Sequence, residues 1–123
     1  MTDLKNKVNA LNKLIINGDT IKAMEIFYAS DIEMQENEDT PRKGKMVCIA
    51  TEKSNLQKVK NVESKLLNKA VDEEKNIVFS EWEILVTYND DRKFMLKQVS
   101  VQHWLNGQII HEKFYYKTIH KVD

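Results

Sequence analysis

The sequence predicts an α+β domain in which helices occupy most of the first half and an antiparallel sheet the second. Apolar residues follow mainly helical spacing as far as Gln57, and alternating strand spacing prevails from Lys60 onward. The chain has 123 residues, enough for one proper core, and no linker, repeat or low-complexity tract interrupts it. We therefore expect a single domain over residues 1–123.

Two antiparallel helices are expected to open the chain. One helix face is formed by apolar residues spaced by four, three and four positions, namely Leu4, Val8, Leu11 and Ile15. Gly18 follows where a left-handed residue would end that helix. A second helix then runs to about Tyr28.

A strand and a third helix come next. Alternation of Ile32, Met34 and Glu36 with polar residues predicts a strand that begins near Ser30. The third helix is expected from Gly44 to about Gln57, with an inward stripe made of Met46, Ile49, Ala50 and Lys53.

The remaining residues predict four strands in a meander, at Val62–Val71, Ile77–Tyr88, Lys93–Trp104 and Gln108–Thr118. The last two are joined by Asn106-Gly107, a strong hairpin signal. Both faces of these strands carry apolar side chains. One set comprises Trp82, Ile84, Val86, Leu96, Trp104, Ile110, Phe114 and Tyr116, and the other Phe79, Leu85, Val99, Val101, Ile109 and Tyr115. Because three helices cover only one face, the second set predicts a homodimer through the outer sheet face.

Composition argues against several classes of protein. Lysine plus arginine and aspartate plus glutamate both total 19, and this balance argues against a nucleic-acid partner. No apolar run approaches the ~18 residues of a membrane span, and the Lys- and Asn-rich start does not resemble a signal peptide. A single cysteine, Cys48, favours a cytoplasmic location. Three glycines and no metal-binding histidine spacing leave no cofactor or metal to expect.

Several segments carry a family resemblance. They are Asn17–Asp19, Phe27–Asp31, Met34–Asn37, Gly44 and Gln98–Tyr116. Over about Leu4 to Lys117 the chain resembles the SnoaL-like family of the nuclear transport factor 2-like superfamily. The resemblance implies a cystatin-like roll, in which a curved sheet wraps round helices into a cone with an internal pocket. Members include isomerases, cyclases, dehydratases, epoxide hydrolases and non-enzymatic binders, so the resemblance predicts a fold more sharply than an activity.

The resemblance also indicates which positions of this chain correspond to the catalytic residues of two groups of enzymes in the superfamily. Ketosteroid isomerases of the superfamily place a carboxylate base at the position of Glu36, but their tyrosine donor falls at Leu11 and their acidic donor near Ser100. Only one of these three roles is kept, which argues against that steroid mechanism. The acid of the epoxide hydrolases falls at Phe114, and their Arg-Asp pair at about Trp82 and Ile84. Epoxide hydrolysis by that constellation is therefore not expected either.

Two glutamates are the candidate catalytic residues. Glu36 continues the inward face of Ile32 and Met34, although the strand could instead reach solvent there. Glu112 alternates with Phe114 on the inward face of the last strand. A buried carboxyl has a raised pKa and can act as an acid or base near neutral pH. The structural alternative for Glu112 is a salt bridge to Lys53.

The expected ligand-binding residues share the inward face and comprise Trp82, Gln98, Ser100, Gln102, Trp104, Phe114 and Tyr116. Pockets of this kind are mostly apolar with a few placed hydrogen-bonding groups. The polar members could equally satisfy one another and buried water, and the aromatic ones could simply form core. The sequence thus favours a pocket for a small hydrophobic molecule. If the protein is an enzyme, we expect general acid-base chemistry in which Glu36 or Glu112 moves a proton, while the missing oxyanion donors favour binding without catalysis. A non-catalytic binding module and a structural dimer with a filled cone are the alternatives.

Overall fold

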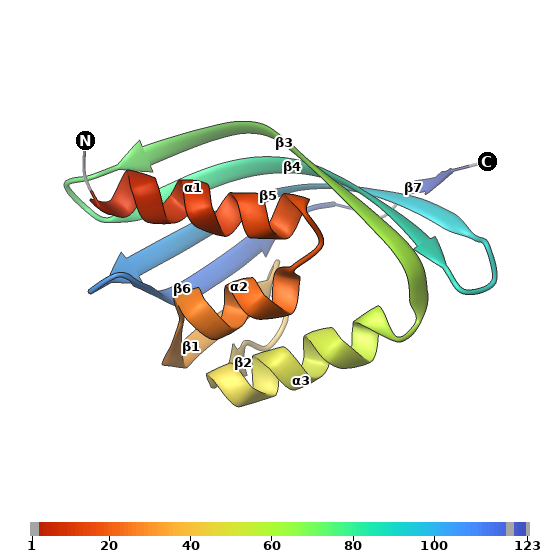
Figure 1. Ribbon diagram of the computed structural model, residues 1–123, viewed down its shortest axis with the longest axis horizontal. Helices are drawn as coiled ribbons and strands as arrows, with labels where there is room; N and C mark the ends of the chain where they lie inside the picture. The colour runs from red at the N-terminus through yellow and green to blue at the C-terminus, as the bar shows by residue number, and fades with distance from the viewer. Residues whose placement is uncertain (1–2, 118–119, 123) are drawn as a thin grey trace.

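A curved sheet holds three helices against its concave side (Figure 1). The computed structural model describes residues 3–117 and 120–122. The helices are α1 (Asp3–Ile16), α2 (Thr20–Phe27) and α3 (Lys45–Leu56). The strands are β1 (Tyr28–Glu36), β2 (Arg42–Lys43), β3 (Val59–Asp72), β4 (Ile77–Tyr88), β5 (Lys93–Leu105), β6 (Gln108–Tyr115) and β7 (His120–Val122). No helix among these residues is long and apolar enough to cross a membrane.

The sheet is mixed, and this corrects the prediction of a wholly antiparallel one. Its strand order is β2-β1-β6-β5-β4-β3, with β7 paired to the start of β5. Strands β3 to β6 form the predicted antiparallel meander, while β1 runs parallel to β6. The parallel pairing joins segments about eighty residues apart, with Met34 opposite Glu112, so no local turn signal could reveal it.

The turn between α1 and α2 follows the glycine signal in the sequence. Gly18 has a φ of +87°, which a residue with a Cβ adopts only at a cost. The Asp19 N–H donates to the Leu14 carbonyl at 2.8 Å, and the Gly18 N–H donates to the Ile15 carbonyl at 3.1 Å. This pair of bonds is a Schellman motif, and it turns α2 back beside α1.

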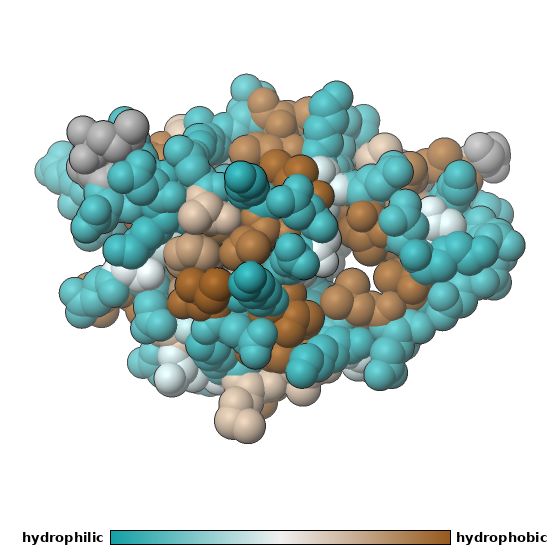
Figure 2. Space-filling model, in the orientation of Figure 1, coloured by the Kyte–Doolittle hydropathy of each residue, from teal (hydrophilic) through white to brown (hydrophobic). Residues whose placement is uncertain are grey.

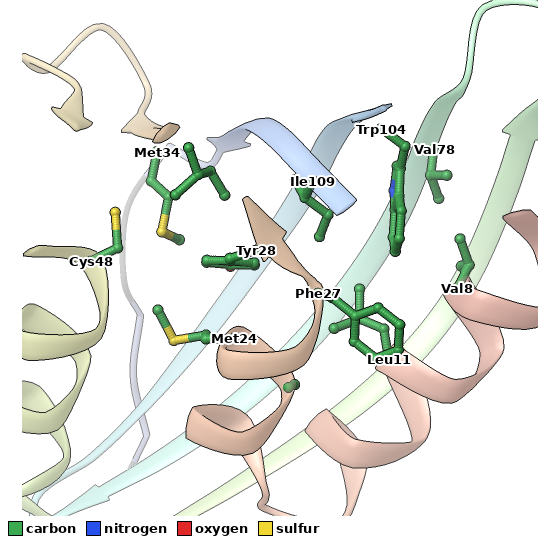
Figure 3. Packing of buried hydrophobic residues seen from close by; sticks show 12 residues of the cluster. Val8, Leu11, Met24, Phe27, Tyr28, Met34, Cys48, Val78, Trp104 and Ile109 are labelled. Carbon is green, nitrogen blue, oxygen red and sulfur yellow. The ribbon is translucent and has the colours of Figure 1, made fainter. Parts of the chain in front are cut away.

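The core lies between the helices and the concave face of the sheet (Figure 3). The Phe27 ring of α2 meets the Trp104 ring of β5 edge to face, with centroids 5.9 Å apart. The buried residues around them are Val8, Leu11, Ala23, Met24, Tyr28, Ile32, Met34, Cys48, Val78 and Ile109. This core anchors the strands whose inward side chains form the candidate site.

A β-bulge in β6 reverses the sides of the sheet that we predicted for Ile109 and Ile110. Ile109 is fully buried and Ile110 is exposed, the reverse of their predicted sides. The register shifts between His103 and Trp104, so that Trp104 pairs with Ile109 and Ile110 has no partner in that ladder. An extra residue at a bulge reverses the alternation on its far side. Ile109 therefore belongs to the core and not to the outer sheet face.

The inward stripe of α3 also differs from the prediction. Met46 is 86% exposed, and Lys53 and Ala50 are exposed as well. Cys48 is buried instead, because it packs beside Met34 in the core (Figure 3). At the other end of the chain, β6 ends at Tyr115, and the predicted strand end at Thr118 lies outside the described residues.

Candidate functional site

A cavity of about 630 Å³ lies between the helices and the concave side of the sheet. Its volume is within the ~300–1,000 Å³ range of small-molecule sites. Figure 2 shows its mouth as a hollow edged by hydrophobic residues, between the helices and the bent strands β3 and β4. The apolar wall includes Val59, Val62, Trp82, Ile84, Val86, Phe94, Leu96 and Phe114. The cone is thus not filled by its own side chains.

Glu112 lies on the wall of this cavity and is only 4% exposed. The hydroxyl of Tyr28, at the start of β1, donates a hydrogen bond to its Oε1. The Gln102 amide, on the neighbouring strand β5, donates to its Oε2 at 2.7 Å. Because Gln102 and Glu112 are register partners on β5 and β6, the sheet itself sets this contact. Lys53 is exposed, and among the described residues no ion pair is formed by Glu112, so the structural alternative of a salt bridge to a lysine is not what the structure shows.

Burial raises the pKa of Glu112, although the bonds from Gln102 and Tyr28 oppose that rise. Desolvation therefore outweighs both bonds, and the direction agrees with the expectation that a buried carboxyl has a raised pKa. Burial and the adjacent Glu112 carboxyl also raise the pKa of Tyr28 well above its ordinary value. Glu112 and Tyr28 therefore form a coupled pair that shares one buried hydrogen bond.

Trp104 holds the far side of this network. Its indole N–H donates to the Gln102 Oε1 at 3.1 Å, so the Gln102 amide nitrogen is the end directed at Glu112. Trp104 is not among the residues that line the cavity, and it packs in the core against Phe27. Trp104 was predicted to bind a ligand, but in the structure it lies behind the cavity wall and supports Gln102, which does line the cavity.

Glu36 lies at a more open part of the cavity, with its side chain 39% exposed. The Arg42 Nη1 donates to its Oε2 at 3.1 Å, and the Tyr116 hydroxyl donates to its Oε1 at 3.1 Å. Arg42 faces inward because it pairs with Met34 on β1. Tyr116, a predicted ligand-binding residue, does not line the cavity wall and contacts the site through this hydrogen bond to Glu36.

Sequence reasoning missed three charged residues of the cavity lining, Arg42, Glu52 and the exposed Lys58. Glu52 is half-buried on α3, one helical turn after Cys48. Burial raises the pKa of its carboxyl, while Arg42 lowers that pKa and Glu36 raises it. The sequence does contain a pattern that could have identified Glu52: the helical spacing of Cys48, Ile49 and Leu56 places it on the same inward stripe.

Five of the seven predicted ligand-binding residues line the cavity. They are Trp82, Gln98, Ser100, Gln102 and Phe114. Within the described part of the chain, no side-chain hydrogen bond is formed by Gln98 or Ser100. Asn12 of α1, which the sequence did not single out, also lines the cavity; it is 5% exposed and its amide nitrogen has no partner among the described residues. These groups remain available to a bound molecule.

His103 and His111 lie on the opposite, convex face of the sheet, as register partners on β5 and β6. Their ring centroids are 5.5 Å apart with a near-perpendicular geometry. Across residues 3–117 and 120–122, no group of three His, Cys, Asp or Glu side chains is placed to hold a metal ion.

Solved structures share this architecture. A Mesorhizobium loti protein assigned as a SnoaL-like polyketide cyclase superposes with a TM-score of 0.79 at 20% identity, over 94% of this chain and 100% of that one. An NTF2-like protein of unknown function from Burkholderia pseudomallei gives 0.81 at 14% identity, over 95% and 92%. The chain has the nuclear transport factor 2-like fold. No protein-family model matches the sequence, and no curated protein matches it either.

The nuclear transport factor 2-like fold also appears in an epoxide hydrolase-like structure. This is an M. tuberculosis LEH-like epoxide hydrolase, with a TM-score of 0.76 at 14% identity over 93% of this chain and 82% of that one. The positions that the resemblance assigned to an epoxide hydrolase acid and its Arg-Asp pair are Phe114, Trp82 and Ile84 here, all on the cavity wall. The shared fold therefore comes with different chemical groups at those positions.

Proposed function

We propose that this protein binds a small hydrophobic molecule in its cavity and that Glu112 exchanges a proton with that molecule. The observation that carries the proposal is a buried carboxyl on the cavity wall whose pKa is raised by desolvation. General acid-base chemistry near neutral pH needs such a shifted group. Proteins of the same fold named for polyketide cyclisation and epoxide hydrolysis support an enzymatic assignment.

Tyr28 extends the reach of Glu112 in this proposal. When Glu112 is ionised, it accepts hydrogen bonds from both Tyr28 and Gln102. When Glu112 is protonated, its own O–H donates to the Tyr28 oxygen, and the Tyr28 proton is then free for an acceptor on the ligand. Trp104 keeps the Gln102 amide in one orientation through both states. The proton therefore moves between Glu112, Tyr28 and the bound molecule.

Glu36 is the second carboxylate assigned to the site. Its ion pair with Arg42 and its bond from Tyr116 favour a role in holding the guanidinium at the cavity wall. Glu36 would then act on the ligand through Arg42, whereas Glu112 acts directly or through Tyr28.

The test begins with the protein purified from its own host. We expect native mass spectrometry to show a retained small molecule, and the isolated molecule to be converted by the wild-type protein. Glu112→Gln should retain the molecule and convert it about 10²–10⁴-fold more slowly. Glu63→Gln, at an exposed carboxylate outside the cavity, is the matched control and should convert it at the wild-type rate.

The alternative is a non-catalytic binding module of the same fold. A retained molecule that neither the wild-type protein nor Glu112→Gln converts would favour this alternative. Conversion at equal rates by both proteins would remove Glu112 from the reaction. Absence of any retained molecule, together with no binding of hydrophobic probes, would count against both functions.

We also propose a homodimer through the outer sheet face, in the cytoplasm that the sequence favours. Phe79, Val99 and Tyr115 lie there on β4, β5 and β6 and are 38–46% exposed. Val101 lies between Phe79 and Lys113 in the register. An apolar group of this kind on neighbouring strands is typical of an interaction surface.

Val101→Lys should weaken this association by at least about 100-fold, since an unpaired charge buried in an interface costs several kcal/mol. Analytical ultracentrifugation at micromolar concentration measures the effect. Ala10→Lys, at an exposed position of α1, carries the same added charge and should leave the dimer intact. If the wild-type protein is a monomer at that concentration, the homodimer proposal is contradicted.

A further inference from the structure

Two buried N–H groups of residues on the cavity wall have no hydrogen-bond partner among the described residues. One is the side-chain amide nitrogen of Asn12, on α1, and the other is the Nε of Arg42, on β2. Buried polar groups in folded proteins nearly always have a partner, and an unpaired one is costly. Because α2 lies between α1 and α3, and β2 contacts α3, the two donors come from different parts of the wall (Figure 1).

The chemistry of these two groups determines what a ligand must supply. An arginine side chain has only donors, and the unpaired atom of Asn12 is a donor as well. An ammonium group also has only donors, so it can satisfy neither of them. A ligand that fits this wall therefore carries a hydrogen-bond acceptor, such as a carbonyl oxygen.

The charges near the wall favour an uncharged acceptor over a carboxylate. Three carboxyl groups line the cavity, those of Glu36, Glu52 and Glu112. The Arg42 guanidinium pairs with Glu36 at 3.1 Å; burial raises the pKa of Glu52 and of Glu112, and the Arg42 charge opposes that rise in both. Lys58 also lines the cavity, but it is exposed. A carboxylate ligand would thus bring a fourth carboxyl group to a guanidinium that is already engaged.

Asn12 is the better placed of the two donors to hold the acceptor. It is 5% exposed, whereas the Arg42 side chain is 28% exposed and is held by Glu36. Asn12 follows Val8 by four positions, so it lies on the buried face of α1, where an apolar residue would be expected. Such exceptions to the local pattern are typical of functional sites.

From these observations we infer that the preferred ligand is an uncharged apolar molecule with a hydrogen-bond-accepting oxygen, as in a ketone or an ester, and that the Asn12 amide donates to that oxygen. This inference rests on the proposed function, because it names the ligand class of the same cavity and a residue that selects it. The apolar body packs on the wall that includes Trp82, Ile84 and Leu96. Asn12 determines specificity, and the proton exchange stays with Glu112.

Three aromatic probes of eight carbon atoms test the inference: ethylbenzene without an acceptor, acetophenone with an uncharged one and phenylacetate with an anionic one. Nuclear magnetic resonance titration at pH 7 measures their affinities. In Asn12→Leu, acetophenone should bind about tenfold more weakly than in the wild type, which corresponds to about 1.4 kcal/mol, while ethylbenzene affinity should not fall. Asn6→Leu, the same substitution at an exposed position of α1, is the matched control and should keep the wild-type affinities. Phenylacetate should bind the wild type more weakly than acetophenone.

The stability of the ligand-free protein gives a second readout. Leucine has nearly the shape of asparagine but no unsatisfied donor, so Asn12→Leu should raise the midpoint of thermal unfolding relative to Asn6→Leu. The control carries the same gain in helix propensity, which therefore cancels in the comparison. A lower midpoint would mean that Asn12 already has a stabilising partner in the folded protein, and this result would contradict the inference.

The outcomes separate this inference from the proposed function. If the probes bind but Asn12→Leu leaves the acetophenone affinity unchanged, Asn12 is not the donor and only the inference fails. If phenylacetate is the tightest probe, the cavity prefers an anion and the inference likewise fails. If none of the three probes binds the wild type, both proposals fail.

A measurement on the wild-type protein keeps the test valid should Asn12→Leu not fold. A hydrogen bond to the acetophenone oxygen should move the side-chain amide proton signal of Asn12 downfield, and ethylbenzene should not do so. The exposed Asn6 amide is the internal control. Equal shifts of the Asn12 signal with both probes would overturn the inference.

Discussion

Trp104→Ala should lower the free energy of unfolding by about 3–5 kcal/mol, the usual cost of removing a buried tryptophan. Trp104 is 4% exposed and packs edge to face on Phe27, at the junction of α2 with β5. The variant also removes the donor that holds Gln102, so the loss affects both the core and the site. Urea unfolding followed by far-ultraviolet circular dichroism measures the change.

Trp104→Phe separates packing from hydrogen bonding. Phenylalanine preserves most of the ring contact with Phe27 but leaves the Gln102 oxygen without its indole donor. We expect a smaller loss of about 1–3 kcal/mol, the cost of one unsatisfied buried group. A loss as large as that of Trp104→Ala would show that the hydrogen bond, and not the packing, dominates the contribution of Trp104.

The helices and the meander could be predicted because local patterns specify them. Gly18 marked the end of α1, and Asn106-Gly107 marked the hairpin between β5 and β6. The parallel β1–β6 pairing could not be predicted, because it depends on contacts between distant segments. The bulge was missed for another reason, since a single unpaired residue, Ile110, leaves no mark in the alternation of apolar residues.

The candidate site was predictable where strand alternation determines the facing of side chains. Alternation placed Gln98, Ser100, Gln102 and Glu112 correctly on the concave side. It failed for residues whose position depends on tertiary packing. Arg42 lies on the two-residue strand β2, too short for any periodic pattern. Glu52 was missed because the prediction rotated α3 toward Met46, which the structure leaves exposed.

Glu112 should make the protein lose stability as pH rises above the ordinary range of a carboxyl group. Its pKa is raised in the folded state, chiefly by burial. Between its unfolded pKa of about 4.5 and its higher folded pKa, the folded protein binds more protons than the unfolded chain, so the free energy of unfolding falls with pH. The contribution is fully present below the unfolded pKa and is lost as pH rises through the folded pKa.

Glu112→Gln isolates this contribution, because glutamine keeps the shape of the side chain and cannot ionise. We expect the free energy of unfolding of the wild type, minus that of the variant, to decrease from pH 5 to pH 8, by at most about 1.4 kcal/mol per pH unit. Glu52 titrates in the same direction and remains in both proteins, so it largely cancels in the difference. Urea unfolding at several pH values gives the slopes, with Glu63→Gln as the exposed control. If the free energy of unfolding changes with pH equally in the wild type and in Glu112→Gln, Glu112 does not titrate in this range. Glu112 could then not be the group that exchanges a proton with the ligand.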